Sequence, residues 1–298
     1  MNILILGGNG FLGSAVTSAL RTNGHNVFVV GIGVDKNDVR NFDILLSDVE
    51  HIKMLLQEND ITIVMHLVSS LLPSSNIENF SRDLDSIFSP TIELLNYCAD
   101  NKIKFVYFSS GGAVYGNQKE IFSEKTKREP VSLYGLSKLN FENAISFFYN
   151  TKGLEYLIIR PSNPYGEGQN IYGKQGIIAV IIGKILKNET IQIWGDGSAV
   201  KDYIYIDDFV FYVTRLIENS NSWYQIYNVG SGIGTSVNNV LATFIQNGIH
   251  LPEVEYIASK NTDVKQMVLD CTKIQNICPH KCINLAEGIK RFWEYANK

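Results

Sequence analysis

The chain has 298 residues, of which 45% are hydrophobic and 19% are charged, and its formal net charge is −4. This balance predicts a substantial packed core and excludes a disordered chain, and the negative net charge argues against nucleic acid or an anionic membrane as a partner. No apolar run reaches the length of a membrane span, and the amino terminus has the pattern of a core strand, not of a signal peptide. We therefore expect a cytoplasmic protein without a membrane span.

The first elements in chain order are a strand, a glycine-rich turn and a helix. An apolar run at 2–6 leads into the turn, and an apolar-periodic helix is expected over 11–23. Glycines let the backbone approach phosphate groups, and the helix amino terminus offers free N–H groups and partial positive charge. This context predicts a dinucleotide pyrophosphate site formed by Gly7, Gly10, Phe11, Leu12 and Gly13.

Short apolar runs continue to alternate with amphipathic helical stretches. Strands are expected at 2–6, 26–30, 61–67, 103–108 and 154–160, and helices at 11–23, 48–58, 80–100 and 132–151. Such alternation predicts an α/β fold in which helical crossovers join the parallel strands of a Rossmann-type doubly wound sheet. After residue 160, prolines, glycines and asparagines indicate a less regular region. We expect a dinucleotide-binding core over 1–160 and a smaller, interleaved, mainly substrate-binding region over 161–298, with some segments returning to the core.

The end of the second expected strand leaves the choice of cofactor open. An acidic residue usually stands there and accepts the hydroxyls of the adenosine ribose. Here Val27–Val30 runs into Gly31–Gly33, with no carboxylate before Asp35 and no arginine beside it for a 2′-phosphate. NADP therefore remains an alternative to NAD. Asp48 is expected to cap the helix that begins at Val49.

Tyr134 and Lys138 stand four residues apart on the expected helix 132–151, so their side chains project from one face. The spacing alone is weak, because common residues recur at it by chance, and an exposed surface pair is the alternative. Together with the glycine turn, the pair indicates an enzyme that transfers a hydride. An ammonium beside a phenol lowers the phenol pKa from near 10, as a general base at neutral pH requires.

The four cysteines, Cys98, Cys271, Cys278 and Cys282, are expected to be reduced thiols. The segment Cys278–Cys282, which reads Cys-Pro-His-Lys-Cys, has a weak likeness to a metal motif. No second pair of ligands lies near it in the sequence. The preferred interpretation is a surface turn before the last helix, and no metal is expected.

Motifs along nearly the whole chain resemble those of the extended short-chain dehydrogenase/reductases, in particular the NAD-dependent nucleotide-sugar epimerase/dehydratase family. The matching segments are Gly7–Gly13, Val64–Leu67, Phe108–Gly116, Tyr134–Lys138, Arg160–Gly166, Trp194–Gly197, Lys201–Asp208 and Tyr227–Gly232. So many motifs in the family's order make a chance likeness negligible. The resemblance implies a nucleotide-sugar substrate, and it favours NAD because epimerases of this family retain that cofactor.

The resemblance also implies roles for individual residues. It makes Tyr134 the catalytic acid/base. It makes Lys138 the residue that lowers the pKa of Tyr134 and anchors the ribose of the cofactor. Beyond the glycine turn, cofactor contacts are implied for Asp43, Ile44, Leu67, Val68, Ser109, Tyr134, Lys138 and Pro161. Substrate contacts are implied for Asn163, Gln192, Trp194, Lys201 and Lys260. Lys201 and Lys260 stand where the family has arginines that bind the diphosphate. A lysine cannot make the pair of parallel hydrogen bonds that an arginine makes to a phosphate.

The chain departs from the family beside the tyrosine. Gly111 stands where a serine or threonine is usual, and Ala113 where a second hydroxyl is frequent. Ser110 is the expected catalytic substitute; for Ser109 and Ser110 alike, a strand-end hydroxyl facing backbone or cofactor is the alternative, and water in the space left by Gly111 is another. Dehydratases of the family carry Thr-Asp-Glu over 111–113, so Gly111, Gly112 and Ala113 predict that water elimination is not the reaction.

The expected activity is 4-epimerisation of a nucleotide-diphosphate sugar through a transient 4-keto intermediate, in a polysaccharide pathway. A nucleotide-4-keto-sugar reductase and a catalytically silent family member are the alternatives. The resemblance further implies a homodimer in which helices 80–100 and 132–151 of both subunits form a four-helix bundle. Apolar residues extend around more of each helix than one buried stripe requires, which supports this expectation.

Overall fold

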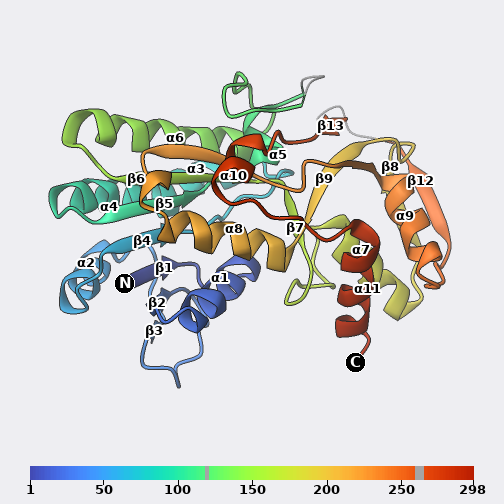
Figure 1. The fold of residues 1–298 in the computed structure, drawn as a ribbon, viewed down its shortest axis with the longest axis horizontal. Coiled ribbons are helices and arrows are strands. Elements are labelled where there is room, and N and C mark those ends of the chain that lie inside the picture. The colour runs from blue at the N-terminus through green and yellow to red at the C-terminus, as the bar shows by residue number, and fades with distance from the viewer. Residues whose placement is uncertain (118–120, 259–264) are drawn as a thin grey trace.

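The computed structural model describes residues 1–117, 121–258 and 265–298 (Figure 1). Its centre is a seven-stranded sheet, parallel throughout, with the strand order β10-β6-β5-β4-β1-β2-β3. The strands are β1 (Asn2–Leu6), β2 (Asn26–Val30), β3 (Asn41–Phe42), β4 (Ile63–His66), β5 (Lys104–Phe108), β6 (Tyr156–Pro161) and β10 (Gln225–Val229). The predicted Rossmann-type doubly wound fold is confirmed.

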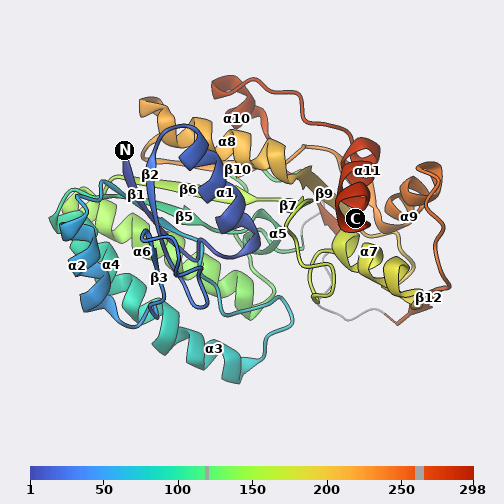
Figure 2. The same ribbon diagram turned by 90° about the horizontal axis from the view of Figure 1, so that it is seen from below.

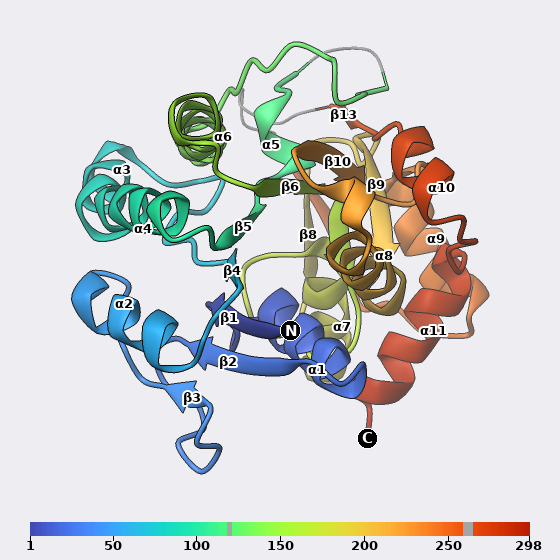
Figure 3. The ribbon, with the colours of Figure 1, turned by 60° about the vertical axis from the view of Figure 1, so that its left-hand side comes forward.

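Helices cover both faces of this sheet (Figures 2 and 3). One face carries α2 (Val49–Glu58), α3 (Ile77–Asp83), α4 (Ser89–Asp100) and α6 (Leu133–Lys152), and the other carries α1 (Phe11–Thr22) and α8 (Ile206–Glu218). A π-helical turn, Leu84–Phe88, joins α3 to α4. The helices predicted over 11–23, 48–58 and 132–151 are confirmed as α1, α2 and α6, and the single helix predicted over 80–100 is divided into α3, the π-helical turn and α4. Asp48 caps α2 as expected, because its side chain accepts the N–H of His51.

The apolar pattern of β1 explains this two-sided packing. Side chains alternate across a strand, so Ile3 and Ile5 face the helix α1, where they join Val16 in one core cluster. Leu4 and Leu6 face the opposite layer and belong to a second cluster with residues of α2 and α4. These four of the five side chains of β1 are fully buried, as in a parallel strand covered on both faces.

The strand order reverses between β1 and β4. The chain passes from β1 outward to β2 and β3, and then starts again at β4 on the other side of β1. Open parallel sheets bind ligands beyond the carboxyl ends of the strands next to such a reversal. The fold therefore points to the turn after β1 and the segment after β4 as the place for a ligand.

The second half of the chain builds a smaller region, on the right in Figure 1. Its strands are β7 (Asn163–Tyr165), β8 (Ile191–Trp194), β9 (Val200–Tyr205), β11 (Gly234–Ser236), β12 (Val254–Ile257) and β13 (Gln266–Met267). Its longer helices are α7 (Ile177–Lys187), α9 (Val237–Gln246) and α11 (Leu285–Ala296). Two short helices, α5 (Gly111–Val114) and α10 (Thr272–Ile277), and a 3₁₀ turn, Ser220–Ser222, complete the described elements. None of the helices described has the length and apolar character needed to cross a bilayer.

Candidate functional site

The turn between β1 and α1 is shaped by its glycines. Gly7 has φ +81°, and a Cβ atom at Gly13 would lie 2.2 Å from the carbonyl oxygen of Gly7. The N-cap residue of α1, Gly10, makes no side-chain capping bond, so the helix amino terminus presents its N–H groups to a ligand. Close backbone approach and a helix amino terminus together fit a dinucleotide pyrophosphate.

Residues predicted to contact the adenosine lie at the β3 edge of the sheet. Asp43 accepts the N–H of Gly33 at 3.0 Å and pairs with Lys36 at 2.9 Å, and these contacts lower the pKa of its carboxyl. Ile44 is buried beside it. A groove of about 550 Å³ opens here, lined by Ile32, Asp43, Ile44, Leu45, Asp48 and His51 among others.

The other predicted cofactor residues gather at the carboxyl ends of β4, β5 and β6. Leu67 donates its N–H to Leu6 at 2.9 Å, and a Cβ at Gly7 would lie 3.2 Å from Val68, so this segment contacts the glycine turn. Pro161 is the last residue of β6. Ser109 is buried with its hydroxyl turned to Glu142 at 2.5 Å, so this hydroxyl is already engaged within the protein.

Ser110, Tyr134 and Lys138 come together where β5 ends and α6 begins. The α6 amino terminus is fixed by Ser132, whose side chain accepts the N–H of Gly135 at 3.1 Å. The Ser110 side chain lies beside the Tyr134 phenol, where its hydroxyl acts to lower the pKa of that phenol. The Lys138 Nζ lies 5.7 Å from the centre of the Tyr134 ring and donates to the carbonyl of Phe108 at 2.9 Å.

Burial dominates the electrostatics of this group. It raises the pKa of Tyr134, and the neighbouring Ser110 hydroxyl acts in the opposite direction. Burial also lowers the pKa of Lys138 to about 8, although the negative charges of Asp83 and Glu142 oppose this shift. The predicted tuning of Tyr134 by the Lys138 ammonium therefore stays a prediction.

The space beside Gly111 is occupied by a leucine. A Cβ at Gly111 would lie 2.8 Å from Leu269 Cδ1 and 3.0 Å from the carbonyl oxygen of Pro161. Leu269 is held there by a β-bridge to Phe122. An apolar side chain therefore crowds the position at which the Cβ atom of the family's serine or threonine would lie. The Ser110 hydroxyl acts on the Tyr134 phenol, and its catalytic role stays a prediction.

Restoring the family's hydroxyl by Gly111→Ser should destabilise the protein by about 1–3 kcal/mol, because the added atoms overpack against Leu269. Adding Leu269→Ala should recover part of this loss, and urea unfolding would measure both changes. Gly112→Ser is the matched control, since its nearest contact would be Met267 at 3.5 Å. A Gly111→Ser variant as stable as Gly112→Ser would show that Leu269 does not restrict this space.

Two of the predicted substrate residues line a cavity of about 220 Å³ in the smaller region. Asn163 and Lys201 lie on its wall with Tyr203 and Ile178, and the Asn163 amide donates to the carbonyl of Asp202 at 2.8 Å. The residues given for this wall do not include Gln192 or Trp194, which are exposed on β8. Lys260 lies outside the described residues.

A buried ion pair behind the site is absent from the sequence-based expectations. Arg160 and Glu142 are both almost fully buried and form a bidentate pair at 2.6 and 2.9 Å. Arg160 also donates to the Tyr115 hydroxyl at 2.7 Å, which in turn donates to Asn228 at 2.7 Å. The sequence could have indicated Glu142, because this residue follows Lys138 by one helical turn. No local pattern indicates that its partner is Arg160 on β6. The network fixes α6 to β5, β6 and β10.

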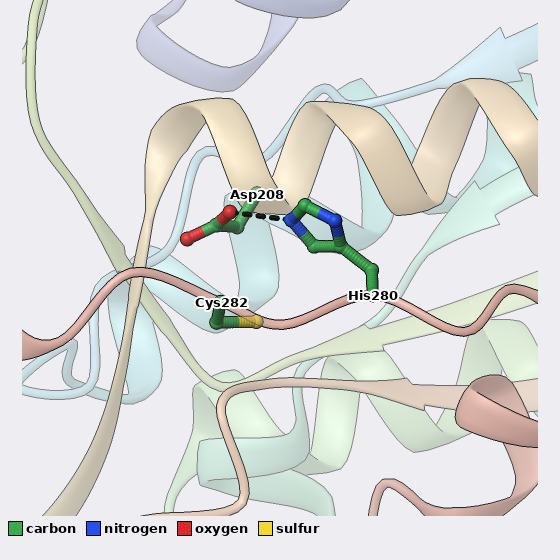
Figure 4. A group of neighbouring side chains, drawn as sticks. All are labelled: Asp208, His280 and Cys282. Atoms are coloured by element: carbon green, nitrogen blue, oxygen red, sulfur yellow. Dashed lines mark hydrogen bonds and ion pairs between the residues drawn. The ribbon is translucent and has the colours of Figure 1, made fainter.

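The segment Cys278–Cys282 meets α8 in a way the sequence does not reveal. Asp208, His280 and Cys282 bring potential metal-ligand atoms within 4.8 Å of one another (Figure 4). His280 Nε2 lies 2.6 Å from Asp208, whose other oxygen accepts the N–H of Ile283 at 3.0 Å. Cys282 lies 3.7 Å from the Tyr212 hydroxyl, and burial raises the pKa of its thiol to about 11. Each group has a protein partner, so we interpret the cluster as an anchor of this segment. All four cysteines are free thiols.

Comparisons with known proteins agree with this geometry. The model of the NAD dependent epimerase/dehydratase family matches residues 3–230. A Methanocaldococcus jannaschii protein, provisionally named UDP-glucose 4-epimerase, is 32% identical and aligns over 97% of this chain and 96% of its own. The dTDP-4-dehydro-6-deoxyglucose reductase of Escherichia coli is 30% identical over 81% of this chain and 80% of its own. The Thermotoga maritima UDP-glucose 4-epimerase, solved with UDP-glucose, superposes with a TM-score of 0.91 and 31% identity, covering 100% of this chain and 99% of that one.

Proposed function

Because the chain belongs to the NAD-dependent epimerase/dehydratase family, we propose that it is an enzyme that interconverts the C4 epimers of a UDP-sugar through a 4-keto intermediate. The observation that carries the proposal is the meeting of Tyr134, Lys138 and Ser110 at the carboxyl end of β5. This is the edge of the sheet at which the glycine turn after β1 offers a pyrophosphate site.

We assign the proton at the sugar O4 to Tyr134. Its phenol exchanges this proton with the substrate, while the Ser110 hydroxyl stabilises the phenolate by donating to it. Lys138 adds positive charge beside the ring and anchors the cofactor ribose. NAD, when bound, supplies the acceptor and later the donor of the C4 hydride.

The remaining contacts divide between the two halves of the chain. We assign the dinucleotide to the core 1–160, with its pyrophosphate at the glycine turn and its adenosine near Asp43 and Ile44. We assign the nucleotide-sugar mainly to 161–298, with Asn163 and Lys201 on the cavity wall. We also propose that the reaction takes place in the cytoplasm and supplies activated sugars for polysaccharide synthesis.

The test begins by denaturing the purified protein and identifying any released dinucleotide by mass spectrometry. The native protein is then incubated with UDP-glucose, UDP-galactose, their N-acetyl forms and UDP-glucuronic acid, and products are followed by NMR. We expect a C4 epimer to form without added cofactor. Turnover that occurs only with a 4-keto substrate and added reduced dinucleotide would establish a reductase instead.

The same spectra test the third reaction of the family. Gly111, Gly112 and Ala113 carry no carboxylate or hydroxyl that could shuttle the protons of water elimination. We expect no 4-keto-6-deoxy product from any nucleotide-activated hexose. Accumulation of that product would show that an acid and a base come from elsewhere in the site.

We also propose a homodimer built on α4, α6 and the π-helical turn before α4. Leu84, Leu136, Phe147 and Tyr149 leave apolar surface exposed on these elements, and Phe147 is 59% exposed. The helices α4 and α6 lie side by side on the outer face of the core (Figures 2 and 3). Packing against the same helices of a second copy would cover this surface about a two-fold axis.

Light scattering at micromolar concentration should therefore give about twice the 33.4 kDa mass of one chain. Phe147→Asp should shift the protein toward the monomer, because it places a charge in the proposed interface. Ile245→Asp is the matched control, since Ile245 is similarly exposed but lies on α9 in the smaller region. A wild-type monomer would refute the dimer and leave the enzymatic proposal untouched.

A further inference from the structure

A buried carboxylate connects the two segments that flank the proposed catalytic pair. Asp83 ends α3, next to the π-helical turn, and only 2% of its surface is exposed. One of its oxygens accepts the Ser137 hydroxyl at 2.8 Å, and the other accepts the Ser70 hydroxyl at 2.5 Å. Ser137 precedes Lys138 on α6, and Ser70 follows the segment of Leu67 after β4. Asp83 thus holds the loop after β4 against the helix that carries Tyr134 and Lys138.

The charges around Lys138 show why this carboxylate matters. The Lys138 ammonium is buried, donates to a neutral carbonyl, and has no carboxylate within 4.0 Å among residues 1–117, 121–258 and 265–298. Two carboxylates act on it from a greater distance, Asp83 and Glu142. The charge of Glu142 is already matched by the bidentate contact with Arg160. The partners of Asp83 are two neutral hydroxyls, so its charge has no such contact cation in the described chain.

The other titratable groups that face Lys138 carry no charge at neutral pH. His66 on β4 is fully buried, and burial lowers its pKa to about 3. Tyr107 on β5 lies with its ring centre 5.1 Å from Lys138 Nζ, and burial raises its pKa far above the usual value. Burial likewise raises the pKa of Tyr134. The uncompensated charge near the Lys138 ammonium is therefore that of Asp83.

We propose that Asp83 is a positioning residue of the active site: it supplies the countercharge of Lys138 and joins the loop after β4 to α6. The proposal rests on the proposed function only in its catalytic consequence, because Lys138 can stabilise a Tyr134 phenolate only while it is an ammonium. The hydrogen-bonded bridge from Ser70 to Ser137 keeps the predicted cofactor segment and the catalytic helix in one arrangement. Neither effect needs a contact between Asp83 and the substrate.

A double-mutant cycle tests the charge coupling without any assay of activity. Urea unfolding is measured for the full-length wild type, Asp83→Asn, Lys138→Met and the double variant. Asparagine keeps the size of the side chain and removes its charge. If Asp83 is the countercharge, Asp83→Asn should reduce the folding equilibrium constant about tenfold less when Lys138 is already methionine. Equal losses in both backgrounds would overturn the proposal.

The cycle remains informative if Asp83→Asn does not fold by itself. Recovery of folding in the double variant would then support the coupling, and a double variant that is unfolded while Lys138→Met folds would overturn it. Because only unfolding is measured, a failed search for the nucleotide-sugar substrate leaves this result intact. Asp85→Asn, on the exposed side of the same helical turn, is the matched control.

The pH profile of turnover tests the catalytic consequence separately. Removing a nearby negative charge destabilises the ammonium and lowers the pKa of Lys138 further below its usual value. The alkaline limb of the turnover profile should therefore move to lower pH, by about one unit, in Asp83→Asn and not in Asp85→Asn. A loss of stability alone would not move this limb. An unshifted limb in Asp83→Asn would refute the role of Asp83 toward Lys138.

Discussion

Replacing Tyr134 by phenylalanine should lower turnover by about 10²–10⁴-fold while leaving the fold and the bound dinucleotide nearly unchanged. The substitution removes one hydroxyl, which is the group we assign to proton exchange with the sugar and on which Ser110 acts. The aromatic ring that packs beside Lys138 stays in place. Turnover, the dinucleotide released on denaturation, and the urea unfolding midpoint would be measured on the same preparation.

Tyr107→Phe is the matched control for this experiment. Tyr107 also lies beside Lys138 and is fully buried, but its hydroxyl has no hydrogen-bond partner among the residues that the structure describes. Removing that hydroxyl should leave turnover within a few-fold of wild type and should not reduce stability. A Tyr134→Phe variant that keeps wild-type turnover would remove Tyr134 from the mechanism, and equal losses in both variants would indicate a structural effect of the phenols.

Arg160→Met should produce the largest loss of stability, about 3–5 kcal/mol of unfolding free energy. It leaves the buried Glu142 carboxylate without its bidentate partner and takes a donor away from the Tyr115 hydroxyl. The side chains of Arg160 and Glu142 are each only 1% exposed, so water cannot replace the missing contacts. Urea unfolding at neutral pH would measure the loss.

Arg128→Met is the control that distinguishes the effect of burial from the effect of removing a positive charge. Arg128 also contacts Glu142, at 3.4 Å, but its side chain is 39% exposed. Its removal should cost no more than about 1 kcal/mol, as for other solvent-exposed ion pairs. If Arg160→Met were no more damaging than Arg128→Met, the buried network would not be what fixes α6 to the sheet.

The elements that the sequence predicted well are those specified by local patterns. The glycine turn follows from residues within one short segment, and the core strands follow from apolar runs such as 2–6, which is β1 in full. The expected strand 61–67 is longer than β4, Ile63–His66, because apolar residues flank the hydrogen-bonded part. Periodicity also identified α6, on which the spacing of Tyr134 and Lys138 depends.

The features that the sequence did not predict depend on contacts between distant segments. Leu269 reaches Gly111 only because a β-bridge brings its segment to Phe122. Asp83 and Ser137 are 54 residues apart and meet because α3 and α6 lie on the same face of the sheet. No pattern near Asp83 distinguishes it from an exposed acidic residue such as Asp85. Identifying such groups requires the packing of helices, which local periodicity does not contain.

The position of β10 at the edge of the sheet also bears on how the protein is made. This strand pairs with β6 but follows it by about 70 residues, which a ribosome adds in roughly 3–14 s. Until then the nascent chain presents β6 with an open edge, next to apolar side chains such as Leu157 and Ile159. An unpaired edge of this kind is a template for association with other chains. Cotranslational folding of the core would therefore leave an interval in which a chaperone protects β6. In a polypeptide truncated before residue 225, the edge of β6 would stay unpaired permanently.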